Sequence, residues 1–340
     1  MPQTTRWTPG PVPWLGVLLA LGCGREGPAP EPRDVARTVP SDAATATPEV
    51  PCRGAPDAGP LSTTDVAAPE RPPDDGPPDD DGEATTTEGA PAEAVHAVPP
   101  QPVGADGWVV CVEPPPGMAC IPGGPFVRGD DRGEADERPA AEVEVSTFYL
   151  DRNEVTNVEF RRCMEAGACR LQHHYPHFND PEQPVVAVDW HGARDYCAWA
   201  GKRLPTEAEW EKAARGGDGR RYPWGDEPPS CERAMYRGCE PEWARPVGSF
   251  AAGPWGLHDL AGNAYEFVQD WYAPCYRGCA GECGDACFGR DPRGPCGGAA
   301  ECPGRERRVL RGGSWFWPAD QLRAANRRGM RPDSGGHRLG

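Results

Sequence analysis

Fifteen cysteines are the residues of this chain whose type and spacing offer the most chemistry. Thiolates bind soft metals, whereas paired cysteines in an oxidising compartment form disulfides. Some pairs bracket loops short enough for local disulfides, although spacing alone leaves the connectivity open. The candidates outside the last cysteine-rich stretch are Cys111 and Cys120, Cys163 and Cys169, and Cys231 and Cys239.

Six further cysteines crowd into residues 275–302, in a segment that reads as an insertion. A thiolate cluster that binds metal would need a reducing environment, so disulfides are the favoured interpretation if the chain is exported. These six disulfide candidates are Cys275, Cys279, Cys283, Cys287, Cys296 and Cys302.

Histidines form a second group, because HHYPH places His173, His174 and His177 close together. Such spacing could hold Zn, Ni or Fe, but a solvated polar loop is the favoured interpretation.

The N-terminus predicts export. Arg6 precedes an apolar run at 14–21 that is too short to span a bilayer. LALGC fits a lipobox, in which Cys23 would carry the lipid; a plain signal peptide is the alternative. Residues 1–23 are therefore expected to be a lipoprotein signal peptide. The mature chain is expected to be anchored to a bacterial membrane, at the outer membrane or cell surface.

Residues 24–106 are rich in Pro, Ala and Thr and hold seventeen acids against five arginines, most of the formal net charge of −17. Such a segment buries too little apolar surface to order, which predicts a disordered acidic tether. Without a basic stripe or a stacking platform, nucleic acid is not an expected partner.

The helices and strands that the sequence predicts for the rest of the chain are short. EVEVSTFYL over 142–150 alternates as a strand, with Val143, Val145, Thr147 and Tyr149 on one side. Thr156 with Glu159 and Thr206 with Glu209 form capping boxes for helices ending near Gly167 and Gly216. Asp189 caps another helix that stops at Gly201. Short strands and long loops fill the rest of 107–340.

Three ordered segments carry a family resemblance: GKRLPTEAEWEKAARGG at 201–217, GLHDLAGNAYEFVQDW at 256–271 and RVLRGGSW at 308–315. Together with FYLDRNEVTNVEF they resemble the formylglycine-generating enzyme, or sulfatase-modifying factor, family. The resemblance implies a compact α+β fold related to C-type lectin-like folds, with little regular secondary structure, here stapled by disulfides. It also places the 275–302 insertion beside the family's peptide-binding groove.

The resemblance implies one structural calcium, held at the positions of Asp259, Gly262, Ala264 and Glu266. Two carboxylates and backbone carbonyls around a glycine turn are hard oxygen ligands of the right kind; the alternative is a turn held only by hydrogen bonds. A second family calcium site falls near Ala234 and Met235, where the expected carboxamide is missing.

The family's catalytic copper needs two thiolates, the first of them three residues after the serine of RGGS. Ser314 is retained, but Trp317 occupies that first position, and no cysteine follows Cys302. Tryptophan cannot ligate Cu(I), so no catalytic residue is assigned and copper is not expected to bind.

By resemblance Cys197 should pair within a final strand, yet the sequence stops at Gly340 before that motif. A truncated C-terminus is therefore expected, with Cys197 either free or paired with a cysteine of the insertion.

Two functions follow. The favoured one is an exported lipoprotein whose family domain is a non-catalytic module that binds a peptide or protein, because catalysis requires site residues and not only a fold. The alternative is an oxidase that converts a substrate cysteine to formylglycine with oxygen.

Overall fold

The computed structural model describes residues 103–105, 107–171, 175–277 and 283–336. The signal segment with Cys23, the tether up to residue 102, His173, His174, Cys279 and residues 337–340 lie outside this part. No helix in the described part is both long and apolar enough to cross a membrane.

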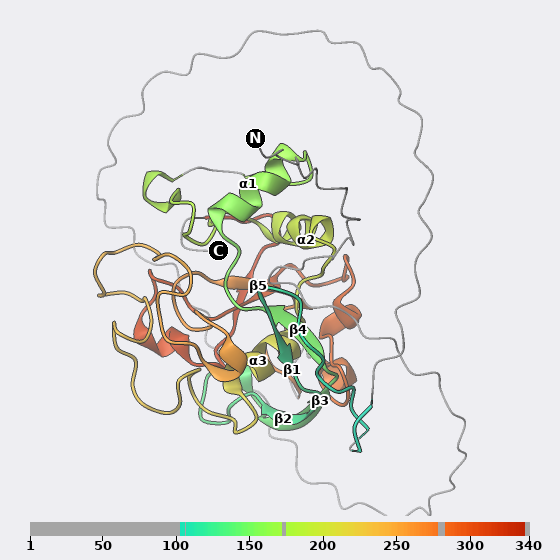
Figure 1. Ribbon diagram of the computed structural model, residues 1–340. Coiled ribbons are helices and arrows are strands. Elements are labelled where there is room, and N and C mark those ends of the chain that lie inside the picture. The colour runs from blue at the N-terminus through green and yellow to red at the C-terminus, as the bar shows by residue number, and fades with distance from the viewer. Residues whose placement is uncertain (1–102, 106, 172–174, 278–282, 337–340) are drawn as a thin grey trace, which may run out of the picture. The chain divides into compact units, whose positions relative to one another are not determined.

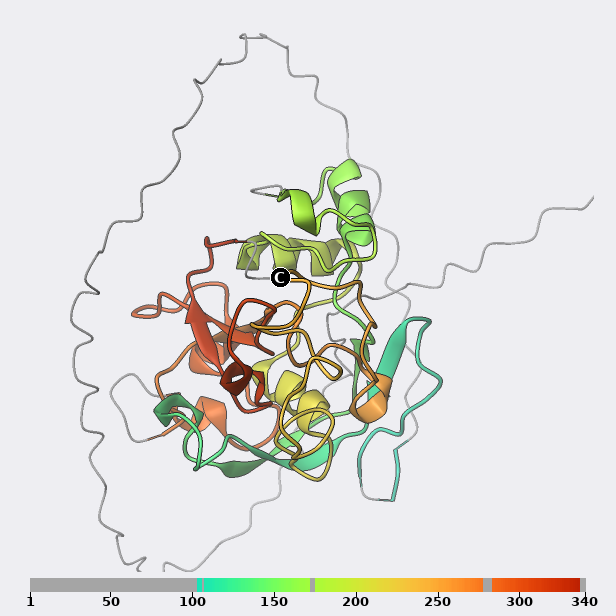
Figure 2. The same cartoon turned by 90° about the vertical axis from the view of Figure 1, so that its left-hand side faces the viewer.

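Capping residues define the helices, as predicted. Within the described part the α-helices are α1 (Asn157–Glu165), α2 (Trp190–Trp199) and α3 (Glu207–Arg215). Thr156 and Thr206 form the capping boxes of α1 and α3, and the Asp189 carboxylate accepts from a backbone N–H in the first turn of α2. In both Figure 1 and Figure 2, α1 and α2 lie together at one end.

The strands are three to six residues long and pair antiparallel in three small sheets. They are β1 (Met118–Ile121), β2 (Gly124–Arg128), β3 (Ala141–Val145), β4 (Phe148–Asp151), β5 (Glu266–Trp271), β6 (Arg308–Arg311) and β7 (Arg328–Met330). The sheets pair β1 with β4, β2 with β3, and β5 with β6 and then β7. The short 3-10 helices are Ala135–Glu137, Pro176–Phe178, Pro254–Gly256, Gly284–Cys287, Pro295–Gly298 and Ala319–Leu322. This is the predicted α+β fold with little regular secondary structure.

The prediction of one continuous strand over 142–150 is wrong. β3 ends before Ser146 and β4 begins after Thr147, and the two strands belong to different sheets. The Ser146 N–H and hydroxyl donate to the Asp291 carboxylate at 2.6 and 2.7 Å, and the Thr147 hydroxyl donates to the Val109 carbonyl. Because these partners lie far away in sequence, local alternation could not reveal the break. The buried residues are Val143, Val145, Phe148 and Leu150, so the predicted placement of Thr147 and Tyr149 fails.

The helix α3 crosses the centre of the domain, and all of its residues are buried (Figure 1). Burying charge is costly unless each charge is paired. Glu207 lies 2.7 Å from Arg327, and Glu211 lies 2.6 Å from Arg311. Burial alone would raise the pKa of Glu207, but the two guanidinium groups hold that pKa below its usual value. Buried ion pairs therefore lie beside the apolar side chains of this core.

Disulfides close several of the loops, as expected. The three local pairs are bonded as their spacing suggested, and two bonds join described cysteines of the insertion: Cys111–Cys120, Cys163–Cys169, Cys231–Cys239, Cys283–Cys287 and Cys296–Cys302. Cys275 and Cys197 are also disulfide-bonded. The alternative of a free Cys197 thiol is therefore wrong.

Candidate functional site

A sharp loop after β6 carries the predicted copper position. Gly312 and Gly313 have φ of 93° and 81°, values that favour glycine. A Cβ on Gly313 would also lie only 2.9 Å from the Leu322 side chain. Ser314 is fully buried, its hydroxyl has no hydrogen-bond partner in the described structure, and its carbonyl accepts from the Trp317 N–H at 3.0 Å.

Trp317 serves as an apolar anchor in this loop. Its ring packs against the cluster that contains Trp190 and Leu310. The Arg328 guanidinium lies 5.6 Å from the ring centroid, within range of a cation–π contact. The indole provides no sulfur, so the position holds the loop in place and cannot ligate copper.

No thiolate elsewhere in the described residues compensates for Trp317, because every cysteine there is disulfide-bonded. A sulfur committed to a disulfide is not the anionic ligand that Cu(I) requires. The described residues therefore do not fit the family's copper.

The predicted calcium loop, residues 259–266, lies directly against residues 312–317, the loop with the predicted copper position, here called the copper loop. The Gly262 N–H donates to the Gly312 carbonyl at 2.9 Å, and the Trp315 N–H donates to the Asn263 carbonyl at 2.9 Å. Gly262 has φ of 84°, and a Cβ there would overlap the Met235 carbonyl oxygen. Backbone bonds and a required glycine thus hold the two loops together.

Three carboxylates converge around this loop: Asp259, Glu266 and Glu154. Loss of hydration, and then repulsion by Asp259 and Glu266, raise the pKa of Glu154 well above its usual value. Loss of hydration raises the pKa of Glu266 to about 7, with a smaller contribution from Asp259. The same loss of hydration raises the pKa of Asp259. The loop therefore gathers carboxyl groups in a poorly hydrated place, where they resist ionisation.

Glu154 is the residue that sequence reasoning missed. Its carboxylate accepts from the Ala264 N–H at 2.8 Å and from the Asn263 side chain at 2.6 Å. It belongs to the segment FYLDRNEVTNVEF, in which only Thr156 and Glu159 were given a role. A glutamate just ahead of a helix cap, in a motif of the family, was the available signal.

The oxygen donors fit a hard cation if backbone carbonyls are included. Asp259 Oδ1 is buried with no hydrogen-bond partner, while Oδ2 accepts from the Gly248 N–H at 2.6 Å. No hydrogen bond of the described structure ends on the Gly262 or Ala264 carbonyl oxygen. Side chains alone do not suffice, since no set of three His, Cys, Asp or Glu residues in the described ranges is arranged to hold a metal. Calcium often takes such mixed oxygen ligands.

The neighbouring loop, where a second family calcium site would fall, is braced by protein bonds. Ala234 and Met235 are buried, and the Cys231–Cys239 disulfide closes the loop around them. The Met235 carbonyl accepts from the Asn263 N–H at 2.9 Å, which ties this loop to residues 259–266.

The histidines that the structure describes stay apart. His177 stacks on Trp243 with ring centroids 5.4 Å apart, and His191 meets Trp190 edge to face. His258 Nδ1 lies 2.9 Å from the Phe250 carbonyl. Each ring is thus engaged with a different neighbour.

The insertion packs on β3 and β5. The Glu144 N–H donates to the Gly289 carbonyl at 2.9 Å, and the Trp271 indole donates to the Ala299 carbonyl at 2.7 Å. A Cβ on Gly294 would lie 2.8 Å from the Asp270 carboxylate, so the insertion approaches the sheet closely. No hydrogen bond in the described ranges joins the insertion to residues 314–317.

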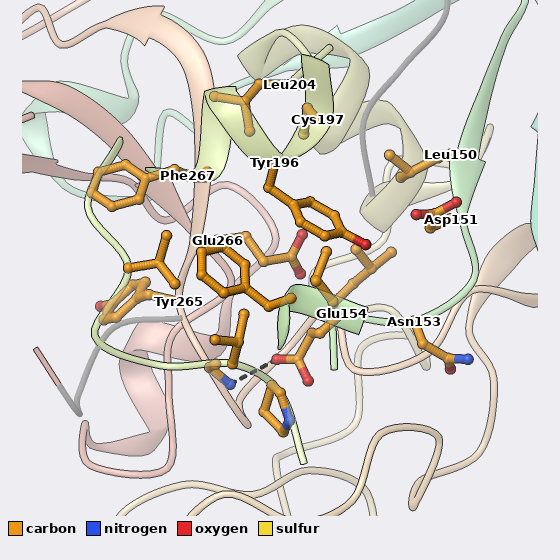
Figure 3. A pocket seen from close by; sticks show the side chains of 18 of the residues that line it. Leu150, Asp151, Asn153, Glu154, Tyr196, Cys197, Leu204, Tyr265, Glu266 and Phe267 are labelled. Atoms are coloured by element: carbon orange, nitrogen blue, oxygen red, sulfur yellow. Dashed lines mark hydrogen bonds between the residues drawn. The ribbon is translucent and has the colours of Figure 1, made fainter. Parts of the chain in front are cut away.

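A pocket of about 90 Å³ lies beside the calcium loop, between α2, β4 and β5 (Figure 3). Apolar side chains form most of its wall. Its polar lining includes Glu154, Glu266, His258 and Tyr196.

Comparisons with known proteins find the same family that the sequence motifs resemble. The profile of the family described as "Sulfatase-modifying factor enzyme 1-like domain" matches residues 109–340. The formylglycine-generating enzyme of Streptomyces coelicolor is 34% identical over 288 residues, covering 66% of this chain and 87% of that protein. The inactive C-alpha-formylglycine-generating enzyme 2 of Mus musculus is 31% identical over 287 residues, covering 66% of this chain and 84% of that protein.

A serine/threonine-protein kinase, pkn1 of Chlamydia caviae, is 36% identical over 235 residues, which cover 63% of this chain. The alignment spans only 35% of that kinase. Among solved structures, PvdO from Pseudomonas aeruginosa aligns with TM-score 0.55 and 28% identity, over 66% of this chain and 91% of that chain. Treponema denticola variable protein 1 aligns with TM-score 0.53 and 22% identity, over 66% and 92%, a likeness of fold alone.

Proposed function

Because this chain belongs to the sulfatase-modifying factor enzyme 1-like domain family, we propose that it acts as a non-catalytic module that binds a peptide or protein. The observation that carries the proposal is Trp317 in the position of the family's first copper thiolate. Activity depends on site residues and not on the fold. That an inactive mammalian protein is among the relatives supports a family domain used without catalysis.

The second candidate is a formylglycine-generating oxidase. The identity to the Streptomyces coelicolor enzyme favours it, since the alignment spans most of that protein. This function would require sulfur ligands that the described residues do not offer beside Ser314. We therefore place it second.

One experiment separates the two. The full chain, with its disulfides intact and in parallel after reduction, is incubated with Cu(I), oxygen and a fluorescent Cys-x-Pro-x-Arg peptide. Mass spectrometry detects the aldehyde, and fluorescence anisotropy detects retention of the peptide. Binding without turnover is expected, and turnover would overturn the proposal.

A variant pair tests where the peptide lies. Phe316→Ala removes a half-buried ring in the loop after Ser314, whereas Trp199→Ala removes an exposed ring at the end of α2. Peptide binding should weaken in the first variant and stay unchanged in the second. The reverse pattern would place the ligand away from the copper loop.

We also propose that Asp259, Gly262, Ala264 and Glu266 hold a structural calcium ion. The two carboxylates would supply charge and the two carbonyls neutral oxygens, with Glu154 positioning the Ala264 backbone. When bound, calcium would neutralise the repulsion among these carboxylates and stiffen the loop that supports Ser314.

For the N-terminus, export and lipidation at Cys23 are likewise proposed, with the membrane reached only through the lipid. The sequence LALGC supports this, because its cysteine follows an apolar run and small residues. Growth with a labelled fatty acid should label the wild-type chain and not Cys23→Ser. Label retained in that variant would contradict lipidation at Cys23.

A further inference from the structure

The pocket of about 90 Å³ between α2, β4 and β5 has a mostly apolar wall. Two apolar clusters meet there, and they contribute Phe160 and Val188 from one and Leu204 and Phe267 from the other. Asn153, an exposed residue, also lines the pocket, so the pocket reaches the surface at the connection between β4 and α1. The volume has room for about three water-sized groups, which suits only a small molecule.

Tyr196 brings an unpartnered hydroxyl to this pocket. The residue is 1% exposed, and its hydroxyl has no hydrogen-bond partner in the described structure. Its ring stacks on Phe160 with centroids 5.5 Å apart, and Figure 3 shows it reaching from α2 into the pocket. The Tyr265 hydroxyl, from the opposite side of the wall, points away from Tyr196 (Figure 3). A buried hydroxyl without a partner costs stability unless a bound molecule completes its hydrogen bond.

The acidic groups and the histidine of the wall already have partners. Glu154 accepts through its two oxygens from an amide side chain and a backbone N–H of the calcium loop. A buried lysine lies 2.9 Å from the Asp151 carboxylate, and a tryptophan indole donates to Glu266 at 2.9 Å. His258 Nδ1 lies 2.9 Å from a backbone carbonyl. Tyr196 is therefore the group that a ligand of this pocket would complete.

The pocket favours an uncharged ligand. An anion would meet the carboxyl groups of Glu154 and Glu266 without a cation to offset them. A cation would lose its hydration to reach carboxylates that are already paired or hydrogen-bonded. A phenolic hydroxyl can donate to a carbonyl oxygen, and apolar walls suit alkyl groups.

We propose that this pocket binds a small uncharged molecule with alkyl groups and one oxygen acceptor, such as a short ketone. Its oxygen accepts from the Tyr196 hydroxyl, and its alkyl groups pack against the apolar wall. The site is separate from the copper loop and rests neither on the peptide-binding proposal nor on the calcium proposal.

Four molecules of matched shape test this chemistry: acetone, isobutene, acetate and guanidinium. Isobutene has a methylene group in place of the carbonyl oxygen, and the two ions carry opposite charges. Saturation-transfer NMR titrations use the full chain with calcium held constant. Acetone should bind saturably, with a dissociation constant of about 0.1 to 10 mM, and both ions should bind more weakly. Absence of saturable acetone binding, or tighter binding of either ion, would overturn the proposal.

Tyr196→Phe tests the hydroxyl. It should weaken acetone binding by about threefold to tenfold, because one hydrogen bond is lost, and leave isobutene binding unchanged. Its melting temperature should not fall, since the hydroxyl that it removes has no partner. Tyr276→Phe is the matched control, because it removes another buried hydroxyl without a partner, within the insertion, and should change neither affinity. Unchanged acetone binding in Tyr196→Phe, or an equal loss for isobutene, contradicts the proposed hydrogen bond.

Ala193→Leu provides the answer if Tyr196→Phe fails to fold. Ala193 lines the pocket one helical turn before Tyr196 and packs against both apolar clusters, so a leucine there should fill the space. Acetone and isobutene should bind at least about tenfold more weakly, with little change in melting temperature. Ala198→Leu makes the same change at an exposed position of α2 and should bind as the wild type does. Binding that survives Ala193→Leu would place the ligand elsewhere and refute the site.

Discussion

The calcium loop, residues 259–266, and the copper loop, residues 312–317, are joined by backbone hydrogen bonds yet differ in the ligands they keep. The calcium loop has carboxylates and carbonyls that the proposed calcium ion could use, whereas the copper loop has Trp317, which offers no sulfur. The bonds between the loops involve main-chain atoms at Gly262, Gly312 and Asn263. The contact between the loops therefore does not depend on which side chains they carry at positions such as 317.

The largest expected effect comes from the ion pairs beneath both loops. Arg311 is fully buried and donates to Glu211 at 2.6 Å and to backbone carbonyls at 324–326. Arg311→Met removes the shorter of the two guanidinium contacts of the buried Glu211, leaving Arg215 at 3.1 Å, and should lower the free energy of unfolding by about 3–5 kcal/mol. Urea denaturation measures the change. Arg132→Met, at a side chain 81% exposed, should cost less than about 1 kcal/mol. Equal effects in the two variants would mean that this network does not support the loops.

Two glycine substitutions test whether the close approach of the two loops stabilises the fold. Gly262→Ala combines a positive φ with overlap against the Met235 carbonyl, and should cost about 2–4 kcal/mol. Gly238→Ala has a φ of 95° with open space around it, and should cost only about 1–2 kcal/mol. Thermal and urea unfolding give the difference. Equal costs would show that the close approach of the two loops is not needed.

Bound calcium should raise the free energy of unfolding, and only a change within the calcium loop should remove this gain. At a free concentration about 100-fold above its dissociation constant, one bound ion adds about 2.7 kcal/mol to the free energy of unfolding. Asp259→Asn should remove most of this gain, because a negatively charged ligand is lost. Asp285→Asn, an exposed acid of the insertion, should leave it intact. Calorimetry and melting curves with and without a chelator provide the test, and an unchanged gain in Asp259→Asn would place calcium elsewhere.

A pH dependence, the smallest effect per pH unit, has one source outside both loops. Burial, and then repulsion by Glu207, raise the pKa of Asp270 to about 7, against an opposing attraction from Arg128 and Arg327. The ordinary pKa of an aspartate is about 3.9, so the folded state binds more protons than the unfolded state between pH of about 4 and 7. Stability should therefore fall as pH rises through this window, by at most about 1.4 kcal/mol per pH unit from this group.

Asp270→Asn should reduce that slope in urea denaturation, while Glu266, whose pKa is also raised to about 7, keeps a slope of the same sign. Asp218→Asn is a control of opposite sign, because its hydrogen bond to Arg220 lowers the pKa of this exposed carboxyl. Its effect should appear only as the pH falls towards and below about 4. A slope that survives Asp270→Asn between pH of about 4 and 7 must arise from other buried carboxyls.

Local features could be predicted from the sequence because their causes are local. Thr156 and Thr206 lie three residues before the glutamates that complete their capping boxes, so both helix starts could be identified from neighbouring residues. The pairs that bracket short loops, such as Cys231 and Cys239, were chosen because few residues separate them. Errors arose where distant partners act, as at Ser146, where Asp291 interrupts a predicted strand.

By itself, the sequence determined the helix starts and the family, and it places Trp317 three residues after Ser314, because residue identity and short spacing are enough for each. Only the tertiary structure decided that Glu154 joins Asp259 and Glu266, and that Tyr196 presents its hydroxyl to a pocket. These groups come from segments far apart in the chain. Their distances, and with them their hydration and charge, exist only after the chain has folded.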